Sequence, residues 1–287
     1  MSLFPRCGLE LPPFAVPPGP VSPSWGDTFT AAARALEAAD RSGFDAVWVA
    51  DGPDAGGFVE PCTVAGGLAA TTSTAVLGVV ADVAHHRHPA VLARDLNAVD
   101  LVSGGRAAIV LADGHLHHPG GPGLPGRLGE AVSIVRGLFA GSPPPRPSSP
   151  THFRWPVAVL RPPPRPPSGP ALAVFVPSRA VAVAHRAPLG ELVRAADAMV
   201  VDGNPEEVAA ACRAIRSAAG GAAAAGARPV LWRGGLPPSD HDGAALLGEL
   251  AAAGIGGVIC RTALGDVPSP GEVQAVGRLV RRAFGAG

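Results

Sequence analysis

Residues 76–113 decide the fold of this chain. They read VLGVV (76–80), HHRHP (85–89), a stretch of helical pattern (89–101), SGGR (103–106) and AAIVL (107–111). An apolar run, a polar loop, a helix closed by two glycines and a second apolar run predict one βαβ crossover. Because both runs are apolar throughout, the strands should be buried on both faces, as in a parallel sheet under helices. Polar residues that leave the carboxyl ends of such strands meet ligands, and here they are histidines.

The same strand and helix unit recurs along the chain. The other predicted strands cover 7–11, 44–50, 172–176, 198–201, 229–232 and 256–260. The other predicted helices cover 30–41, 60–72, 127–139, 178–196, 205–217, 240–253 and 270–284. This alternation over 287 residues predicts an α/β fold with a single (β/α)8 TIM-type barrel domain, residues 1–287.

A Pro-rich segment, residues 141–170, interrupts the alternation between the fourth helix and the fifth strand. Its SPPPRPSSP and RPPPRPP runs favour polyproline II conformation. A linker between two domains is one interpretation. We predict a surface excursion of one domain instead, because strands and helices of the same unit length resume beyond it.

Charge and composition exclude several classes of protein. The formal net charge is zero, so there is no electrostatic footprint for nucleic acid or an anionic membrane, and a small-molecule substrate is favoured. The first residues show no basic and then long apolar leader, and no stretch is apolar enough for a membrane span, so we expect a cytoplasmic protein. The four cysteines form no C-x-x-C pair, which predicts reduced core thiols.

Several segments resemble the bacterial luciferase-like monooxygenase family when read together. They are AADRSGFDAVWVAD (38–51), EP (60–61), RHPAVLA (87–93) and DLVSGGR (100–106), in the order and at the spacing of the family. The resemblance is dense over residues 30–140 and continues through 170–197. It implies a TIM-type barrel that holds FMN, or the deazaflavin F420, across its carboxyl-end mouth.

The resemblance also implies an activity and an assembly. No G-x-G-x-x-G follows a strand, so we expect a monooxygenase that receives reduced FMN from a partner flavin reductase and oxygenates a small organic substrate. An F420-dependent reductase or dehydrogenase is one alternative. A homologue that has lost catalysis and acts as a binding or scaffold subunit is another. The family pattern implies a homodimer through the second and third helices, with apolar residues at Val64, Leu68, Val91, Leu92 and Leu96.

We expect cofactor contacts at the ends of the third and fourth strands. The residues concerned are Val79, Val80, Ala81, Ala112 and Asp113. Where the family often has glycines that let the backbone approach the flavin, this chain has Val110 and Ala112. The Asp113 carboxylate would repel a phosphate, or it could contact a ring nitrogen or the substrate.

The cofactor phosphate is expected beyond the fifth to seventh strands. Ser178 and Arg179 open a predicted helix there, and a hydroxyl, a guanidinium and free backbone N–H groups suit an anion. An ordinary Ser N-cap beside a surface arginine would look the same. Arg233, at the end of the seventh strand, is a second candidate. Glu130, in RLGEA (127–131), is expected to be structural.

Six histidines follow the third and fourth predicted strands, at positions 85, 86, 88, 115, 117 and 118. A neutral imidazole could exchange a proton with the substrate or during oxygenation, whereas three imidazoles could bind zinc, and solvated loop histidines are the plainest interpretation. His88 precedes a helix-opening proline and could serve the loop itself. We select His85 and His86 as catalytic candidates and assign no metal ligand. Asp51 and Asp113 are the further candidates, because Gly52 stands where the family often has histidine.

Overall fold

The computed structural model describes most of the chain. The described residues are 4–12, 14, 25–52, 59–83, 88–113, 125–141, 152–154, 159–164, 169–183, 186–220, 228–237, 240–262 and 267–284. None of the helices in these ranges is long and apolar enough to cross a membrane.

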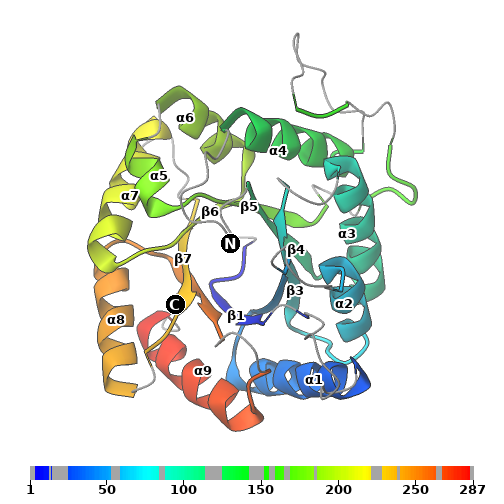
Figure 1. Ribbon diagram of the computed structural model, residues 1–287, viewed down its shortest axis with the longest axis vertical. Helices are drawn as coiled ribbons and strands as arrows, with labels where there is room; N and C mark the ends of the chain where they lie inside the picture. The colour runs from blue at the N-terminus through cyan, green and yellow to red at the C-terminus, as the bar shows by residue number, and fades with distance from the viewer. Residues whose placement is uncertain are drawn as a thin grey trace.

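Eight parallel strands of the described chain close into a barrel in sequence order, with β8 paired to β1 (Figure 1). They are β1 (Cys7–Leu11), β2 (Ala46–Ala50), β3 (Val76–Asp82), β4 (Ala107–Ala112), β5 (Ala171–Phe175), β6 (Ala198–Val201), β7 (Val230–Gly235) and β8 (Gly257–Arg261). The predicted (β/α)8 barrel is confirmed. β7 continues through Gly235 because Gly234 and Gly235 still pair with β8, so Arg233 lies within the strand and not beyond it.

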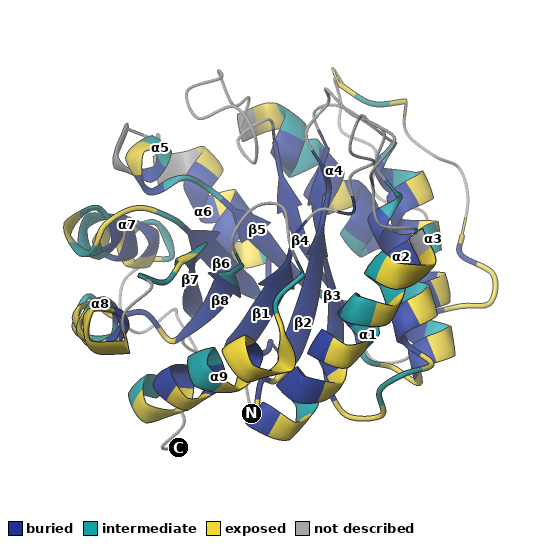
Figure 2. Cartoon of the chain, turned by 60° about the horizontal axis from the view of Figure 1, so that its bottom comes forward, coloured by how far each residue is buried: buried dark blue, intermediate teal, exposed yellow. Residues whose placement is uncertain are grey.

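Helices surround the barrel, and Figure 2 shows buried strands inside helices whose outer faces are exposed. They are α1 (Trp25–Ser42), α2 (Pro61–Leu68), α3 (Pro89–Ser103), α4 (Pro125–Phe139), α5 (Ser178–Val183), α6 (Arg186–Ala195), α7 (Pro205–Ala218), α8 (Asp240–Ala252) and α9 (Pro270–Phe284).

Three helix predictions were wrong, and one of them is the end of α2, which lies at Leu68 and not at residue 72. α1 begins at Trp25, five positions before the predicted start at residue 30, with Asp27 in its first turn. The predicted helix 178–196 is two helices, α5 and α6. Pro188 lies in the first turn of α6, where its missing N–H leaves no helical hydrogen bond unmade, whereas it would interrupt one continuous helix.

Helix starts follow local chemistry. Pro61, Pro89 and Pro205 each occupy a first-turn position. Asn204 and Glu207 form a reciprocal capping box at the start of α7. These caps fix where each helix begins, and so where the preceding loop leaves its strand.

Alternate residues of each strand face the barrel interior. Trp48 fills the interior near the amino end of the barrel, and its indole stacks on Phe4 with ring centroids 5.6 Å apart. A β carbon at Gly8 or Gly78 would come within 2.3 or 2.1 Å of Trp48 atoms, so both glycines make room for this ring. The indole Nε1 is buried and has no hydrogen-bond acceptor within the described residues. Phe4 and Trp48 therefore close the amino end of the barrel.

The DLVSGGR motif builds that amino end. Gly104 ends α3 in the left-handed region with φ 79°, and the Asp100 carboxylate accepts the N–H of Ala107 at 3.1 Å. The Arg106 guanidinium donates to the carbonyl oxygens of Ser103, Ala75, Ala69 and Thr72. This motif holds loops together at the amino end of the barrel, opposite the carboxyl ends of the strands, so it serves folding.

The described parts of the Pro-rich segment lie against α3 and α4. The His88 Nε2 and the Arg154 carbonyl oxygen are 2.6 Å apart, and Glu130 accepts from the N–H groups of His152 and Phe153 at 3.2 and 3.3 Å. The Asn97 amide donates to the Pro162 carbonyl at 3.0 Å. Glu130 thus has the structural function predicted for it.

The cysteines are free and buried in the core, as the sequence predicts. Burial raises the pKa of the Cys7 thiol to about 11, and the nearby Asp45 carboxylate adds to the shift. A thiol with so high a pKa carries almost no thiolate at neutral pH, so Cys7 is chemically inert.

Candidate functional site

Two aspartates lie where β2 and β3 end. Asp51 is fully buried, and its Oδ2 accepts the backbone N–H of Asp82 at 2.8 Å. The N–H of Asp51 continues the strand ladder to the Val80 carbonyl at 2.9 Å. Asp82 itself is buried and pairs in register with Ala112 of β4. The predicted catalytic residue Asp51 therefore holds the backbone at the base of the mouth.

The predicted cofactor residues of β3 and β4 divide between two faces. Val80 and Ala112 belong to the interior cluster, together with Val110, and all three are buried. Val79 and Ala81 pack instead in the layer between strands and helices. A ligand in the mouth could reach Val79 and Ala81 only through backbone atoms. Asp113 follows Ala112 and is buried, as a carboxylate next to the mouth.

Ser178 is committed to a neighbouring loop. Its backbone N–H donates to the Asp202 carboxylate at 3.1 Å, and its hydroxyl donates to the Asp202 carbonyl oxygen. Both donors that were expected to bind a phosphate are therefore engaged within the protein. Arg179 is exposed, and its guanidinium makes no hydrogen bond or ion pair to the described residues. Arg179 remains available for an anion.

A buried ion pair crosses the barrel interior between β1 and β7. Arg233 donates from Nε and Nη2 to the two carboxylate oxygens of Glu10, each at 2.6 Å. The two side chains are 5% and 4% exposed, so the pair is shielded from water. The Arg233 guanidinium also lies over the Phe175 ring, 5.6 Å from its centroid. Arg233, a predicted phosphate ligand, thus has a protein carboxylate as its first partner.

Arg261 joins this pair from β8. Its Nε lies 3.7 Å from Glu10 Oε1, and its side chain is 37% exposed. The pKa of Arg261 is lowered by burial and by the positive charge of Arg233, against the attraction of Glu10 and Asp202. Two arginines therefore share one glutamate at this side of the mouth.

The remaining predicted site residues, His85 and His86, lie outside the described residues. His88 is described, and it is the N-cap of α3: its Nδ1 accepts the Ala90 N–H at 3.1 Å. This is the loop function predicted for His88. Within the described ranges, no group of three or more His, Cys, Asp or Glu side chains could hold a metal ion.

The sequence interpretation missed Glu10, Asp82 and Arg261. Each is a charged residue at an inward-facing position of a strand end that is otherwise apolar, in CGLEL, VLGVVAD and GVICR. A charge within an apolar strand was therefore the signal available in the sequence. Its meaning depended on partners, and Glu10 and Arg233 are 223 positions apart.

A comparison of the sequence with protein families identifies the family to which this closed barrel belongs. The model for luciferase-like monooxygenases matches residues 11–255. The chain belongs to the luciferase-like monooxygenase family. No curated protein sequence matches significantly.

Solved structures of similar fold include both flavin and F420 proteins. The coenzyme F420 dependent tetrahydromethanopterin reductase from Methanopyrus kandleri has a TM-score of 0.70 at 14% identity, covering 98% of this chain and 99% of that one. The monooxygenase RslO1 from Streptomyces bottropensis has a TM-score of 0.67 at 20% identity, covering 97% and 98%. The oxygenating constituent of 3,6-diketocamphane monooxygenase from Pseudomonas putida, solved with FMN, has a TM-score of 0.66 at 14% identity, covering 98% of both chains. At these identities the likeness shows the fold.

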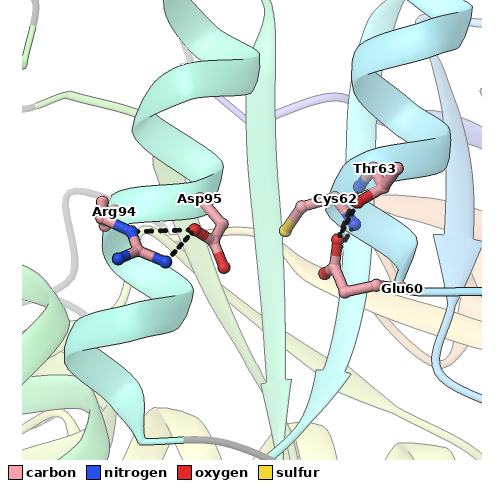
Figure 3. Close-up of polar contacts among 5 residues, drawn as sticks. All are labelled: Glu60, Cys62, Thr63, Arg94 and Asp95. Carbon is pink, nitrogen blue, oxygen red and sulfur yellow. Dashed lines mark hydrogen bonds and ion pairs between the residues drawn. The ribbon is translucent and has the colours of Figure 1, made fainter.

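The family motif at Glu60-Pro61 is a helix cap (Figure 3). The Glu60 carboxylate accepts the N–H groups of Cys62 and Thr63 at 2.9 and 2.6 Å and the Thr63 hydroxyl at 2.8 Å. Beside it on α3, Arg94 and Asp95 form an ion pair at 3.0 Å, and the Arg94 side chain is 69% exposed. The Glu60 contacts fix the start of α2, and the Arg94–Asp95 pair lies within α3.

Proposed function

We propose that this chain is a flavin-dependent monooxygenase that takes reduced FMN from a separate reductase and oxygenates a small organic substrate in the cytoplasm. The family match over residues 11–255 carries this proposal. The charged groups at the carboxyl ends of β1, β3, β7 and β8 support it, because TIM-barrel enzymes bind their ligands at that end. When bound, reduced FMN would supply the electrons that activate dioxygen.

The described residues fit FMN in part. Arg179 offers an unengaged guanidinium for the phosphate, whereas Ser178 and Arg233 already bind Asp202 and Glu10. Val80, Val110 and Ala112 present small or medium apolar side chains to the interior, which suits the edge of a flavin ring. Asp113 adds negative charge near any anionic group in the mouth. We therefore propose that FMN binds weakly and that Arg179 holds its phosphate.

The chain's own residues would supply proton transfer and orientation. His85 or His86 is proposed as the general acid or base, because an imidazole carries either charge state near neutral pH. Asp113 is proposed to orient the ring or the substrate. Asp51 is proposed to act by holding the Asp82 backbone in place, through the hydrogen bond of 2.8 Å.

An F420-dependent reductase or dehydrogenase is the second candidate. It is supported by the two structural neighbours that are named for F420, the Methanopyrus reductase and a secondary alcohol dehydrogenase in complex with an F420-acetone adduct. A catalytically inactive binding subunit is the third, supported by the filled positions Val110 and Ala112 and by Gly52.

Cofactor titration separates these candidates. The purified protein is titrated with FMN, riboflavin and F420 by fluorescence, and oxygen consumption is measured with a flavin reductase and NADH. Preference for FMN with substrate-dependent oxygen consumption supports the monooxygenase. Preference for F420 with hydride transfer supports the second candidate, and binding of none of the three supports the inactive subunit.

A further inference from the structure

The charges around Glu10 do not balance at close range. Glu10 is 3% exposed, and its carboxylate is the only carboxylate among the described residues within 4.0 Å of either Arg233 or Arg261. Arg233 takes both oxygens at 2.6 Å, whereas Arg261 reaches Oε1 only at 3.7 Å. One carboxylate thus faces two guanidiniums, and its interaction with Arg261 is the weaker of the two.

Groups from neighbouring elements do not supply the missing charge. Asp202, after β6, attracts Arg261 but does not lie within 4.0 Å of it as an ion pair, and its Oδ1 accepts the Ser178 N–H at 3.1 Å. From β5, Phe175 offers an aromatic face to Arg233. Thr262, which follows β8, is held by the backbone carbonyl of Glu10 on β1: both its N–H and its hydroxyl donate to that oxygen at 3.1 Å.

Arg261 is therefore a partly buried cation with unused donors. Its Nη1 and Nη2 groups make no hydrogen bond or ion pair to the described residues, and its side chain is 37% exposed. The Nη1 of Arg233 is likewise unpaired within the described part of the chain, in a side chain that is 5% exposed. A cation that is partly shielded from water favours a close anion, and among the described residues Arg261 has only Glu10, at 3.7 Å.

We propose that Arg261, backed by Arg233, is the binding site for a carboxylate group of the substrate. The planar edge formed by Nη1 and Nη2 of a guanidinium matches the two oxygens of a carboxylate. Arg261 pairs in register with Gly235 and with Glu10, so it lies nearer the carboxyl end of the barrel than Ile259, the partner of Arg233. The site therefore opens toward the mouth and has a fixed cation beneath it.

This assignment narrows the proposed function to substrates that carry a carboxylate. The statement that the bound carboxylate belongs to a substrate rests on the proposed function. A cofactor phosphate has similar chemistry and is the competing source of an anion. We assign the phosphate to Arg179 and the carboxylate to Arg261 because the exposed Arg179 has no partner among the described residues, whereas Arg261 is tied to the buried pair.

The test is isothermal titration of the full-length protein, with and without FMN, using benzoate and hexanoate as probes and their neutral amides as controls. The native protein should bind the carboxylates at least tenfold more tightly than the amides. Arg261→Gln should remove that preference, and Arg261→Lys should keep part of it, since the charge stays and the planar fork is lost. Arg278→Gln removes an exposed charge from α9 and should change nothing. Glu10→Gln, if it folds, should tighten carboxylate binding because a competing anion is gone.

Three results would overturn the assignment. The first is equal binding of both carboxylates and both amides by the native protein. The second is unchanged carboxylate binding in Arg261→Gln. The third is a loss in Arg261→Gln of FMN affinity relative to riboflavin, which would show that Arg261 holds the cofactor phosphate. If FMN does not bind but the carboxylate preference depends on Arg261, the site stands and only the proposed cofactor fails.

Discussion

The carboxylate of Asp51 accepts a 2.8 Å hydrogen bond from the backbone N–H of Asp82, and this bond joins the ends of β2 and β3. Asp51 is fully buried, so removal of the carboxylate leaves a buried N–H without an acceptor. Asp51→Ala should therefore lower the free energy of unfolding by about 1–3 kcal/mol. Urea denaturation measures this change.

Asp51→Asn is the matched variant. Its amide oxygen can still accept the Asp82 N–H, so it should lose much less stability than Asp51→Ala. Turnover decides whether Asp51 has a second, catalytic role: a stable Asp51→Asn protein with full turnover confines the residue to positioning. A stable protein with little turnover would show that the charge itself is needed.

His85→Ala or His86→Ala should reduce turnover by roughly a hundredfold or more without unfolding the protein, as loss of a general acid or base does. The control is His152→Ala, on the Pro-rich segment, where the contact with Glu130 is made by the backbone N–H and survives the change. Full activity in both the residue 85 and residue 86 variants would transfer the proton-transfer role to Asp51 or Asp113.

Asp113→Asn should tighten FMN binding by about 1 kcal/mol, because the Asp113 carboxylate no longer repels the phosphate. The native protein should purify colourless and bind FMN with a dissociation constant in the micromolar range or weaker, which corresponds to about 8 kcal/mol or less. Fluorescence titration at low salt measures both proteins, and riboflavin separates the contributions. A gain for FMN alone places Asp113 near the phosphate, whereas a gain for neither, or a yellow native protein, contradicts that placement.

Arg233→Met should lower the free energy of unfolding by about 3 kcal/mol, since it leaves the Glu10 carboxylate buried with only the distant Arg261 as a partner. Glu10→Gln/Arg233→Met removes both charges and should be more stable than Arg233→Met alone. Chemical denaturation of the two proteins gives the comparison. A double variant less stable than the single one would mean that Glu10 is stabilised chiefly by Arg261.

The proposed dimer depends on α3. Val64, Leu68, Leu92 and Leu96 are buried within the chain, so of the five apolar residues only Val91, at 38% exposure, is available to a partner. Val102, 68% exposed, lies 11 residues further along, about three helical turns, so the two valines share a face. Val91→Arg should convert a dimer to a monomer in light scattering. Ala252→Arg, exposed on α8 across the barrel (Figure 1), should leave the mass unchanged, and a native monomer would contradict the proposal.

The fold could be predicted closely because its signals are local. The bounds 7–11, 198–201 and 270–284 agree with β1, β6 and α9 residue for residue. Apolar runs, proline at helix starts and paired glycines each act within a few positions of where they stand. The start of α1 escaped because WGDTFT lacks an apolar stripe and begins the helix with a glycine at its second position.

The site could be predicted only in part because its contacts are not local. The sequence shows that Arg233 follows an apolar run, but not that Glu10, on β1 at the other side of β8, neutralises it. It shows Ser178 at a helix start, but not that Asp202 occupies the donors of that residue. The placement of His85 and His86 stays a prediction.

The Trp48 indole, which lies against Gly8 and Gly78 and stacks on Phe4, closes the amino end of the barrel interior. A barrel that is closed at its amino end can be entered only from its carboxyl end. Under the proposed function, substrate, cofactor and dioxygen would all enter from the carboxyl end of the barrel, and the product would leave from the same end. The molecule that binds deepest in the interior must therefore bind first and be released last. The closed amino end thus predicts an ordered sequence of binding and release.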